Sequence, residues 1–236
     1  MTPAPLITPN ELQKRLGEGR LRIVDATVHL SFDADGAHVR SGRDTYLQGH
    51  LPGAVFLDQI TELSDPNGEA PFASASSENF AAAVGAAGIG NDSTVVVYDT
   101  VNGIWATRLW WQFGLEGFDD VVVLDGGYNA WVAAGLPTET GESTHPAATF
   151  TAHRRPERIA STDEVVTATA ESSVLLVNAL DPTVRPVTYC GGGIAATAAA
   201  FALKALGRDD VAVYDGSMNA WTADPDRPLS SADSRP

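Results

Sequence analysis

Cysteine is nearly absent from this sequence. Cys190 is the single cysteine among 236 residues, so the chain cannot form an internal disulfide. The first residues, Met1 to Pro5, contain neither the basic nor the apolar stretch of a secretion signal. No uninterrupted apolar run approaches the roughly 18 residues needed to span a bilayer. These absences predict a cytoplasmic protein without a membrane-spanning segment.

Positive charge is also scarce. Fifteen Lys and Arg residues against thirty Asp and Glu give a net charge of −15. So acidic a chain repels phosphate backbones and anionic lipids, and we expect neither nucleic acid nor a membrane as partner. The five histidines show no paired ligand spacing, so no metal is expected, and no cofactor is predicted. The predicted partners are small molecules.

Hydrophobic residues make up 44% of the chain, enough for a globular core. The most informative stretch surrounds the single cysteine. A short β-branched run ends at Cys190, three glycines follow, and the Ala- and Leu-rich segment from Ile194 to Leu206 contains no helix breaker. This order predicts a strand, a tight loop and a helix.

The predicted loop would favour an anion on the cysteine. Glycines let the backbone curl around a ligand, and a helix N-terminus carries roughly half a positive charge. The five residues whose N–H groups are predicted to bind that anion are Gly191, Gly192, Gly193, Ile194 and Ala195. Because the thiolate is the nucleophilic form of cysteine, Cys190 is a candidate nucleophile. The alternative is a small buried hydrophobic side chain, as many free cysteines are.

The chain repeats one pattern of elements. A helix start with a Ser/Thr and Glu capping box precedes a strand at residues 8–26 and again at residues 161–179. A strand, a glycine turn and a helix recur at residues 94–131 and 187–221. This alternation predicts an α/β protein of two units, each with a mainly parallel sheet flanked by helices.

The second unit is predicted to be shortened in its middle. Seventy-three positions separate Asp25 from Tyr98, whereas 11 separate their counterparts Asn178 and Tyr189. Between the units lies a segment rich in Pro, Gly, Ser and Thr without an apolar period, which is typical of a linker. The expected divisions are residues 6–140 for a complete unit, 141–157 for the linker and 158–229 for the shortened unit.

Six motifs follow one another along the chain: GHLPGAVFLD (residues 49–58), VVVYD (95–99), RLWW (108–111), VVVLDGGYNAW (121–131), VTYCGGG (187–193) and VAVYDGSMNAW (211–221). In this order they resemble the tandem-domain rhodanese-like sulfurtransferases, which act on thiosulfate or 3-mercaptopyruvate. The resemblance covers about residues 6–229.

The resemblance implies a reaction as well as a fold. In this family the N-terminal unit is usually catalytically silent, and the C-terminal unit supplies a cysteine at the head of a six-residue loop. Here Asp99 stands where the second unit has Cys190, and a carboxylate cannot carry a sulfane sulfur. The implied function is transfer of a sulfane sulfur from thiosulfate or 3-mercaptopyruvate, through a Cys190 persulfide, to cyanide or a thiol. Such double displacement predicts ping-pong kinetics.

The sequence departs from the family beside the cysteine. Gly191 and Gly192 replace the basic residues typical of thiosulfate-preferring members, and Gly192 also replaces the hydroxyl residue of mercaptopyruvate-preferring members. The Asp and His that accompany that hydroxyl would lie near Ile60 and Ala70, which do not match. The family's substrate-binding arginines fall in the interval that the second unit lacks. Weak, unselective activity is therefore expected.

Two other functional classes compete with this reading. A cysteine phosphatase needs an arginine after the loop to hold phosphate bidentately, but Ala196 stands there. The stronger alternative is a degenerate, non-catalytic binding or scaffold protein. Its support is the missing interval, because losing strands should expose sheet edge and core surface. Self-association is one hypothesis for how that surface is covered.

Aromatic and acidic residues in the motifs carry structural expectations. Trp105, Trp110 and Trp111 are expected to pack in the core and between the two units. Asp125 and Asp215 each precede a glycine turn and are expected to accept hydrogen bonds from the N–H groups of those turns.

Overall fold

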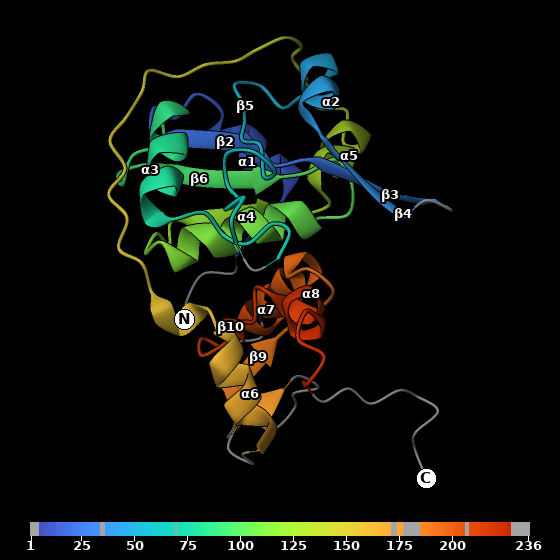
Figure 1. The fold of residues 1–236 in the computed structure, drawn as a ribbon. Helices are drawn as coiled ribbons and strands as arrows, with labels where there is room; N and C mark the ends of the chain where they lie inside the picture. The colour runs from blue at the N-terminus through green and yellow to red at the C-terminus, as the bar shows by residue number, and fades with distance from the viewer. Residues whose placement is uncertain are drawn as a thin grey trace.

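Two α/β units form the chain, and they lie one above the other in Figure 1. The computed structural model describes residues 5–33, 36–68, 70–170, 174–176, 185–205 and 208–227. Within those ranges no helix is both long and apolar enough to cross a membrane.

The first unit is built on a five-stranded parallel sheet. Its order is β1 (Leu6–Ile7), β7 (Val121–Leu124), β6 (Thr94–Tyr98), β2 (Leu21–Asp25) and β5 (Val55–Phe56). The strands are rich in valine and leucine because both faces of a parallel sheet are covered by helices. The parallel arrangement predicted from the alternating pattern is therefore present.

Helices cover both faces of this sheet. Side chains alternate along β6, so Val95 and Val97 face one layer while Val96 and Tyr98 face the other. The first layer consists of α3 (Ser77–Ala86) and α4 (Ile104–Leu115), and the second of α1 (Pro9–Arg15) and α5 (Gly127–Ala133). Helix α2 (Arg43–Gln48) follows the antiparallel hairpin of β3 (Val28–Asp33) and β4 (Gly36–Ser41).

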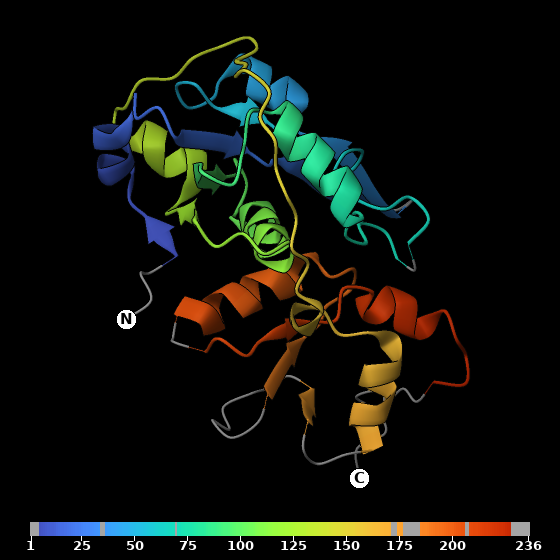
Figure 2. The same cartoon turned by 90° about the vertical axis from the view of Figure 1, so that its left-hand side faces the viewer.

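The second unit repeats the centre of this arrangement. In the described residues its parallel sheet has the order β10 (Ala212–Val213), β9 (Arg185–Thr188) and β8 (Val174–Leu176), matching β7, β6 and β2. Helix α7 (Ile194–Ala205) packs against α4 of the first unit, while α6 (Thr162–Ala170) and α8 (Ser217–Thr222) lie on the opposite side of the sheet (Figures 1 and 2).

Local signals in the sequence correspond closely to the observed elements. The capping box of α1 is complete, because Thr8 and Glu11 exchange backbone-to-side-chain hydrogen bonds. Ser161 and Glu164 form the same pair before α6. The helix after the cysteine begins at Ile194, as predicted. The preceding strand begins two residues earlier than predicted and ends before Tyr189. Residues 177–184, where the shortening is predicted, lie outside the described residues.

Two segments differ from expectation. The predicted linker ends within the short 3-10 helix η1 (Pro156–Arg158) and, before it, runs along the first unit (Figure 2). There Phe150 is buried against Phe80, Phe113 and Phe118, so this segment contributes to the core despite lacking an apolar period. The antiparallel hairpin of β3 (Val28–Asp33) and β4 (Gly36–Ser41), which the sequence pattern did not indicate, projects from the body (Figure 1).

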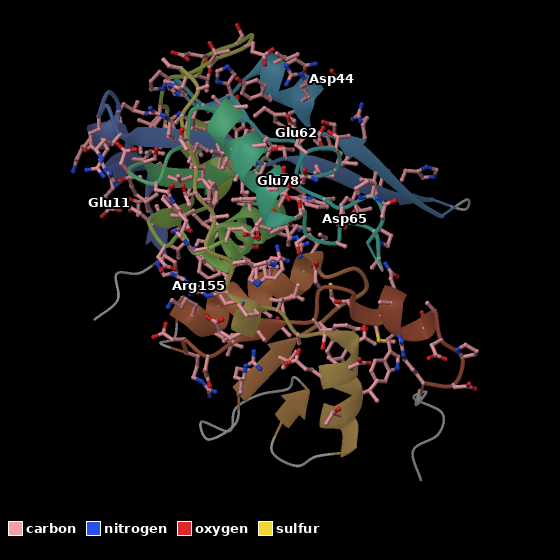
Figure 3. All side chains as sticks on the ribbon, turned by 60° about the vertical axis from the view of Figure 1, so that its left-hand side comes forward. Glu11, Asp44, Glu62, Asp65, Glu78 and Arg155 are labelled. Carbon is pink, nitrogen blue, oxygen red and sulfur yellow. The ribbon has the colours of Figure 1, made fainter. Side chains whose placement is uncertain are left out.

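The junction between the units is largely aromatic and aliphatic. Trp110 of α4 meets Phe201 of α7 edge-to-face, with 5.0 Å between ring centroids. Trp105, Trp110 and Trp111 are all buried, and Trp105 packs with Ile194 of the second unit, which confirms their expected place in the core and between the units. By contrast, labelled carboxylates such as Glu11, Asp44 and Glu78 are spread over the first unit (Figure 3).

Candidate active site

Cys190 lies between the end of β9 and the start of α7. It is half-buried and is a free thiol. Gly193, just before the helix, has a φ of 81°, a left-handed conformation that glycine adopts without steric cost. The first unit has the same arrangement, since Gly103 has a φ of 87° just before α4. The predicted strand, glycine loop and helix are therefore present in both units.

The corresponding loop of the first unit holds an anion of its own. Asp99 is buried at the position equivalent to Cys190. Its carboxylate accepts four backbone hydrogen bonds, at 2.8 and 2.9 Å from the N–H groups of Val101 and Gly103 and at 3.1 and 3.0 Å from those of Trp105 and Ala106. A turn and helix N-terminus of this kind bind negative charge through oriented N–H dipoles.

The backbone of the Cys190 loop is held by the start of α8. The N–H of Met218 donates to the carbonyl of Cys190 at 3.0 Å, and the N–H of Asn219 donates to the carbonyl of Gly191 at 2.9 Å. In a trans peptide the N–H points opposite to the preceding carbonyl. The N–H groups of Gly191 and Gly192 therefore point away from α8.

The five predicted anion-binding residues have different environments. Gly191 and Ala195 are exposed, Gly192 is half-buried and Gly193 is buried. Ile194 is buried by contacts with Val28 and Trp105 of the first unit. In the described residues none of the five donates its N–H to a protein acceptor. Their assignment as ligand-binding groups remains a proposal.

The first unit supplies a wall next to this loop. Phe72 and Ile60 belong to the same apolar cluster as Ile194, and a Cβ placed on Gly192 would lie 3.9 Å from the carbonyl oxygen of Pro71. Ala70 is buried in a separate apolar cluster, which includes Val165 of α6 and Trp221 of α8. The two positions where the family's Asp and His were sought therefore carry apolar contacts. The site lies where the two units meet.

The carboxylate of Asp215 was expected to accept hydrogen bonds from the N–H groups of the glycine turn that follows it, but its hydrogen-bond partners in the described residues lie elsewhere. Its carboxylate turns toward the first unit, where it accepts a hydrogen bond from the N–H of Ser74 at 2.7 Å and pairs with Arg108. Arg108 is 1% exposed and also donates to the carbonyl of Phe72 at 2.5 Å. Asp125, the counterpart in the first unit, is exposed. The prediction for Asp215 was wrong because a buried cation from a distant helix outcompetes the local turn.

Ser217 is a second feature that the sequence reading missed. It is fully buried, has a φ of 46°, and its Oγ accepts the N–H of Cys190 at 3.0 Å. A comparison of the two repeats could have indicated it, because DGGY at residues 125–128 becomes DGSM at residues 215–218. This change places a serine where the first unit has Gly127.

The fold and the loop together define a class: a parallel α/β protein with a cysteine between the end of a strand and the start of a helix. The chain belongs to the rhodanese-like family. The model of the Rhodanese-like domain matches residues 8–134 and residues 155–224, which is most of the chain and consistent with a tandem arrangement.

Similar sulfurtransferases support this membership. SseB of Mycobacterium tuberculosis is 34% identical over 245 aligned residues, covering 80% of this chain and 85% of SseB. The 3-mercaptopyruvate sulfurtransferase of Escherichia coli is 27% identical over 271 aligned residues, covering 92% of this chain and 95% of that protein. The crystal structure of SseA from Escherichia coli has a TM-score of 0.79 at 24% identity and covers 90% of this chain and 98% of SseA, which supports the fold.

Proposed function

We propose that this protein transfers a sulfane sulfur from thiosulfate or 3-mercaptopyruvate to cyanide or a thiol, with Cys190 as the carrier. In the first half-reaction the Cys190 thiolate attacks the outer sulfur of thiosulfate, and sulfite leaves as the S–S bond breaks. With 3-mercaptopyruvate the thiolate attacks the thiol sulfur, the C–S bond breaks, and the enolate of pyruvate leaves and takes up the proton of the donor thiol. The product is a Cys190 persulfide. In the second half-reaction the acceptor attacks the outer sulfur of the persulfide and releases the thiolate.

The observation that carries this proposal is the carboxylate in the equivalent loop of the first unit. Asp99 shows what this backbone arrangement binds, because four N–H groups converge on its two oxygens. In the second unit Cys190 also stands between a strand and a helix that begins after a left-handed glycine, with three residues between it and α7 where four separate Asp99 from α4. A persulfide there would be stabilised electrostatically by N–H groups that need no reorganisation. The first unit is by the same logic silent, since Asp99 cannot accept sulfur.

Family membership favours an enzyme over a non-catalytic scaffold. The Escherichia coli relative is named for its activity as a 3-mercaptopyruvate sulfurtransferase, and it covers nearly the whole chain. The resemblance of the sequence motifs adds thiosulfate as a second proposed donor. Neither a basic side chain nor a hydroxyl stands at positions 191 and 192, so we propose weak selectivity between these donors.

The divisions at residues 6–140, 141–157 and 158–229 remain part of the proposal. The alignment to the Escherichia coli relative spans 271 positions, more than the 236 residues of this chain, so that relative has positions without a counterpart here. We assign this difference in length to the second unit, because 11 positions separate Asn178 from Tyr189 where 73 separate Asp25 from Tyr98.

The decisive experiment measures sulfur on the protein itself. Wild-type protein incubated with either donor, and analysed by intact mass spectrometry under non-reducing conditions, should gain one sulfur that cyanide removes. Cys190→Ser should gain none and should form no thiocyanate. Ser93→Ala, a change on the far end of the first sheet, is the matched control and should behave as wild type. Sulfur transfer by Cys190→Ser would exclude Cys190 as the carrier.

A further inference from the structure

The helix that follows β10 begins with a residue in an unfavourable conformation. Ser217 has a φ of 46°, in the left-handed region that costs a residue with a side chain roughly 1–2 kcal/mol. In the first unit Gly127 occupies the equivalent place with a φ of 57°. Glycine would relieve this strain in the second unit as well. The serine therefore needs a compensating interaction.

That interaction is with the candidate nucleophile. The Oγ of Ser217 accepts the N–H of Cys190 at 3.0 Å and donates to the carbonyl of Tyr214 at 2.8 Å. One hydroxyl thus acts as acceptor and donor at once, and its side chain is completely buried. Replacing Ser217 by Ala or Gly would leave the part-buried N–H of Cys190 without this partner, which is costly.

The other contacts of α8 act on the same segment. The N–H groups of Met218 and Asn219 donate to the carbonyls of Cys190 and Gly191, so three consecutive residues of α8 hold three backbone groups of the loop. The first unit keeps the contact equivalent to that of Met218, since Tyr128 donates to the carbonyl of Asp99 at 3.1 Å. The hydroxyl contact is the addition made in the unit with the cysteine.

We propose that Ser217 is a positioning residue that fixes the Cys190 backbone so that the sulfur faces the N–H groups of its loop. This inference rests on the proposed function. Ser217 touches neither donor nor acceptor; it orients the residue that does. A displacement of the nucleophile by about 1 Å can lower a rate by on the order of 100-fold.

Two variants test this role. Ser217→Gly removes the hydroxyl and relieves the left-handed strain, while Ser217→Ala removes the hydroxyl and keeps the strain. We expect both to lower kcat for sulfur transfer by roughly 10- to 100-fold with little change in the KM of the donor. Ser217→Gly should keep a Tm within about 4 °C of wild type. A lower kcat at a nearly unchanged Tm in Ser217→Gly would separate loss of activity from loss of stability.

Alkylation of Cys190 by iodoacetamide provides a readout independent of turnover. Loss of positioning should slow alkylation at fixed pH, whereas mere loosening of the fold should expose the thiol and speed it. The control is Ser93→Ala, because the Oγ of buried Ser93 accepts an amide hydrogen bond from Gly90 at 3.0 Å, remote from the cysteine. This variant should match wild type in both assays.

The outcomes distinguish the two proposals. If wild type gains no sulfur from either donor, or if Cys190→Ser still transfers it, the proposed function fails. If wild type takes up sulfur but both Ser217 variants retain its kcat and its alkylation rate, the positioning role is overturned. Faster alkylation together with a lowered Tm in both variants would likewise assign Ser217 a structural role.

Discussion

Asp99 and Cys190 occupy equivalent positions in the two units, each between the end of a strand and the start of a helix. In each unit a valine-containing strand ends, a turn with a left-handed glycine follows, and a helix begins. The first unit fills the anion position with a carboxylate of its own, and the second presents a sulfur there. Under the proposed function, sulfur transfer requires the side chain that differs between these two positions.

The donor preference should depend on the residue two positions after the cysteine. Gly192→Ser restores the hydroxyl typical of mercaptopyruvate-preferring members. A Cβ at this position would lie 3.2 Å from the Nδ2 of Asn219, so a small shift of that side chain is sufficient. We expect turnover of 3-mercaptopyruvate to rise only a few-fold, because Ile60 and Ala70 cannot supply the accompanying groups. Steady-state kinetics with both donors measure this, and a rise to a family-typical rate would contradict it.

A buried carboxylate in the first unit makes stability depend on pH. Burial raises the pKa of Asp25 to about 6 from its ordinary value of 3.8. Among the residues that the structure describes, no group lies in hydrogen-bond geometry to its Oδ2. The folded state therefore holds the proton more tightly than the unfolded state. This contribution is present in full below pH 3.8 and is lost as pH rises through 6, at a total cost of roughly 3 kcal/mol.

Asp25→Asn should remove this pH dependence. Asparagine can still accept the hydrogen bond that the N–H of Thr27 gives to Asp25. At pH 8 we expect the variant to have the larger free energy of unfolding, by about 1–3 kcal/mol, with the difference vanishing near pH 4. Urea unfolding at several pH values checks this. Asp44→Asn, at an exposed position of α2 (Figure 3), should show no such trend; a parallel trend would contradict the assignment to Asp25.

The glycine loop contains two positions with opposite tolerance. Gly193 has a φ of 81°, and a Cβ there would lie 2.4 Å from the carbonyl oxygen of Asp215, whereas a Cβ on Gly191 meets nothing within 4 Å. Gly193→Ala should therefore destabilise the second unit by more than about 1 kcal/mol and abolish sulfur uptake. Gly191→Ala, the matched change two residues away, should leave the free energy of unfolding nearly unchanged. Equal effects of the two changes would exclude this account of the loop.

The two units are held together by a buried ion pair as well as by apolar packing. The side chains of Arg108 and Asp215 are 1% and 7% exposed. Arg108→Met leaves a buried carboxylate without its cation, which typically costs about 3–5 kcal/mol. The free energy of unfolding should fall by that order, or the second unit should unfold in a separate transition at lower urea.

A double-mutant cycle isolates the pair. Arg108→Met with Asp215→Asn should lose less stability than the sum of the single changes, because both charges are then absent. Arg43→Ala, which breaks an exposed pair with Glu142, is the control and should cost less than about 1 kcal/mol. Additive losses at Arg108 and Asp215 would show that the ion pair does not couple the units.

The sequence by itself determined the features that depend on neighbouring residues. Each of these features depends on residues a few positions apart, so the backbone period and the residue type are enough to predict it. They are the capping boxes, the strand-to-helix order, the repeat, and the contrast between Asp99 and Cys190. The family resemblance added the reaction.

Only the tertiary structure decided which distant groups meet. Ser217 reaches an amide 27 residues away, and Arg108 reaches a carboxylate 107 residues away. Phe150 joins the core from a segment with no apolar period because the chain, after α5, must cross the first unit to reach the second. Such contacts follow from how helices and sheets pack, and sequence spacing carries no record of them because the partners share no local period.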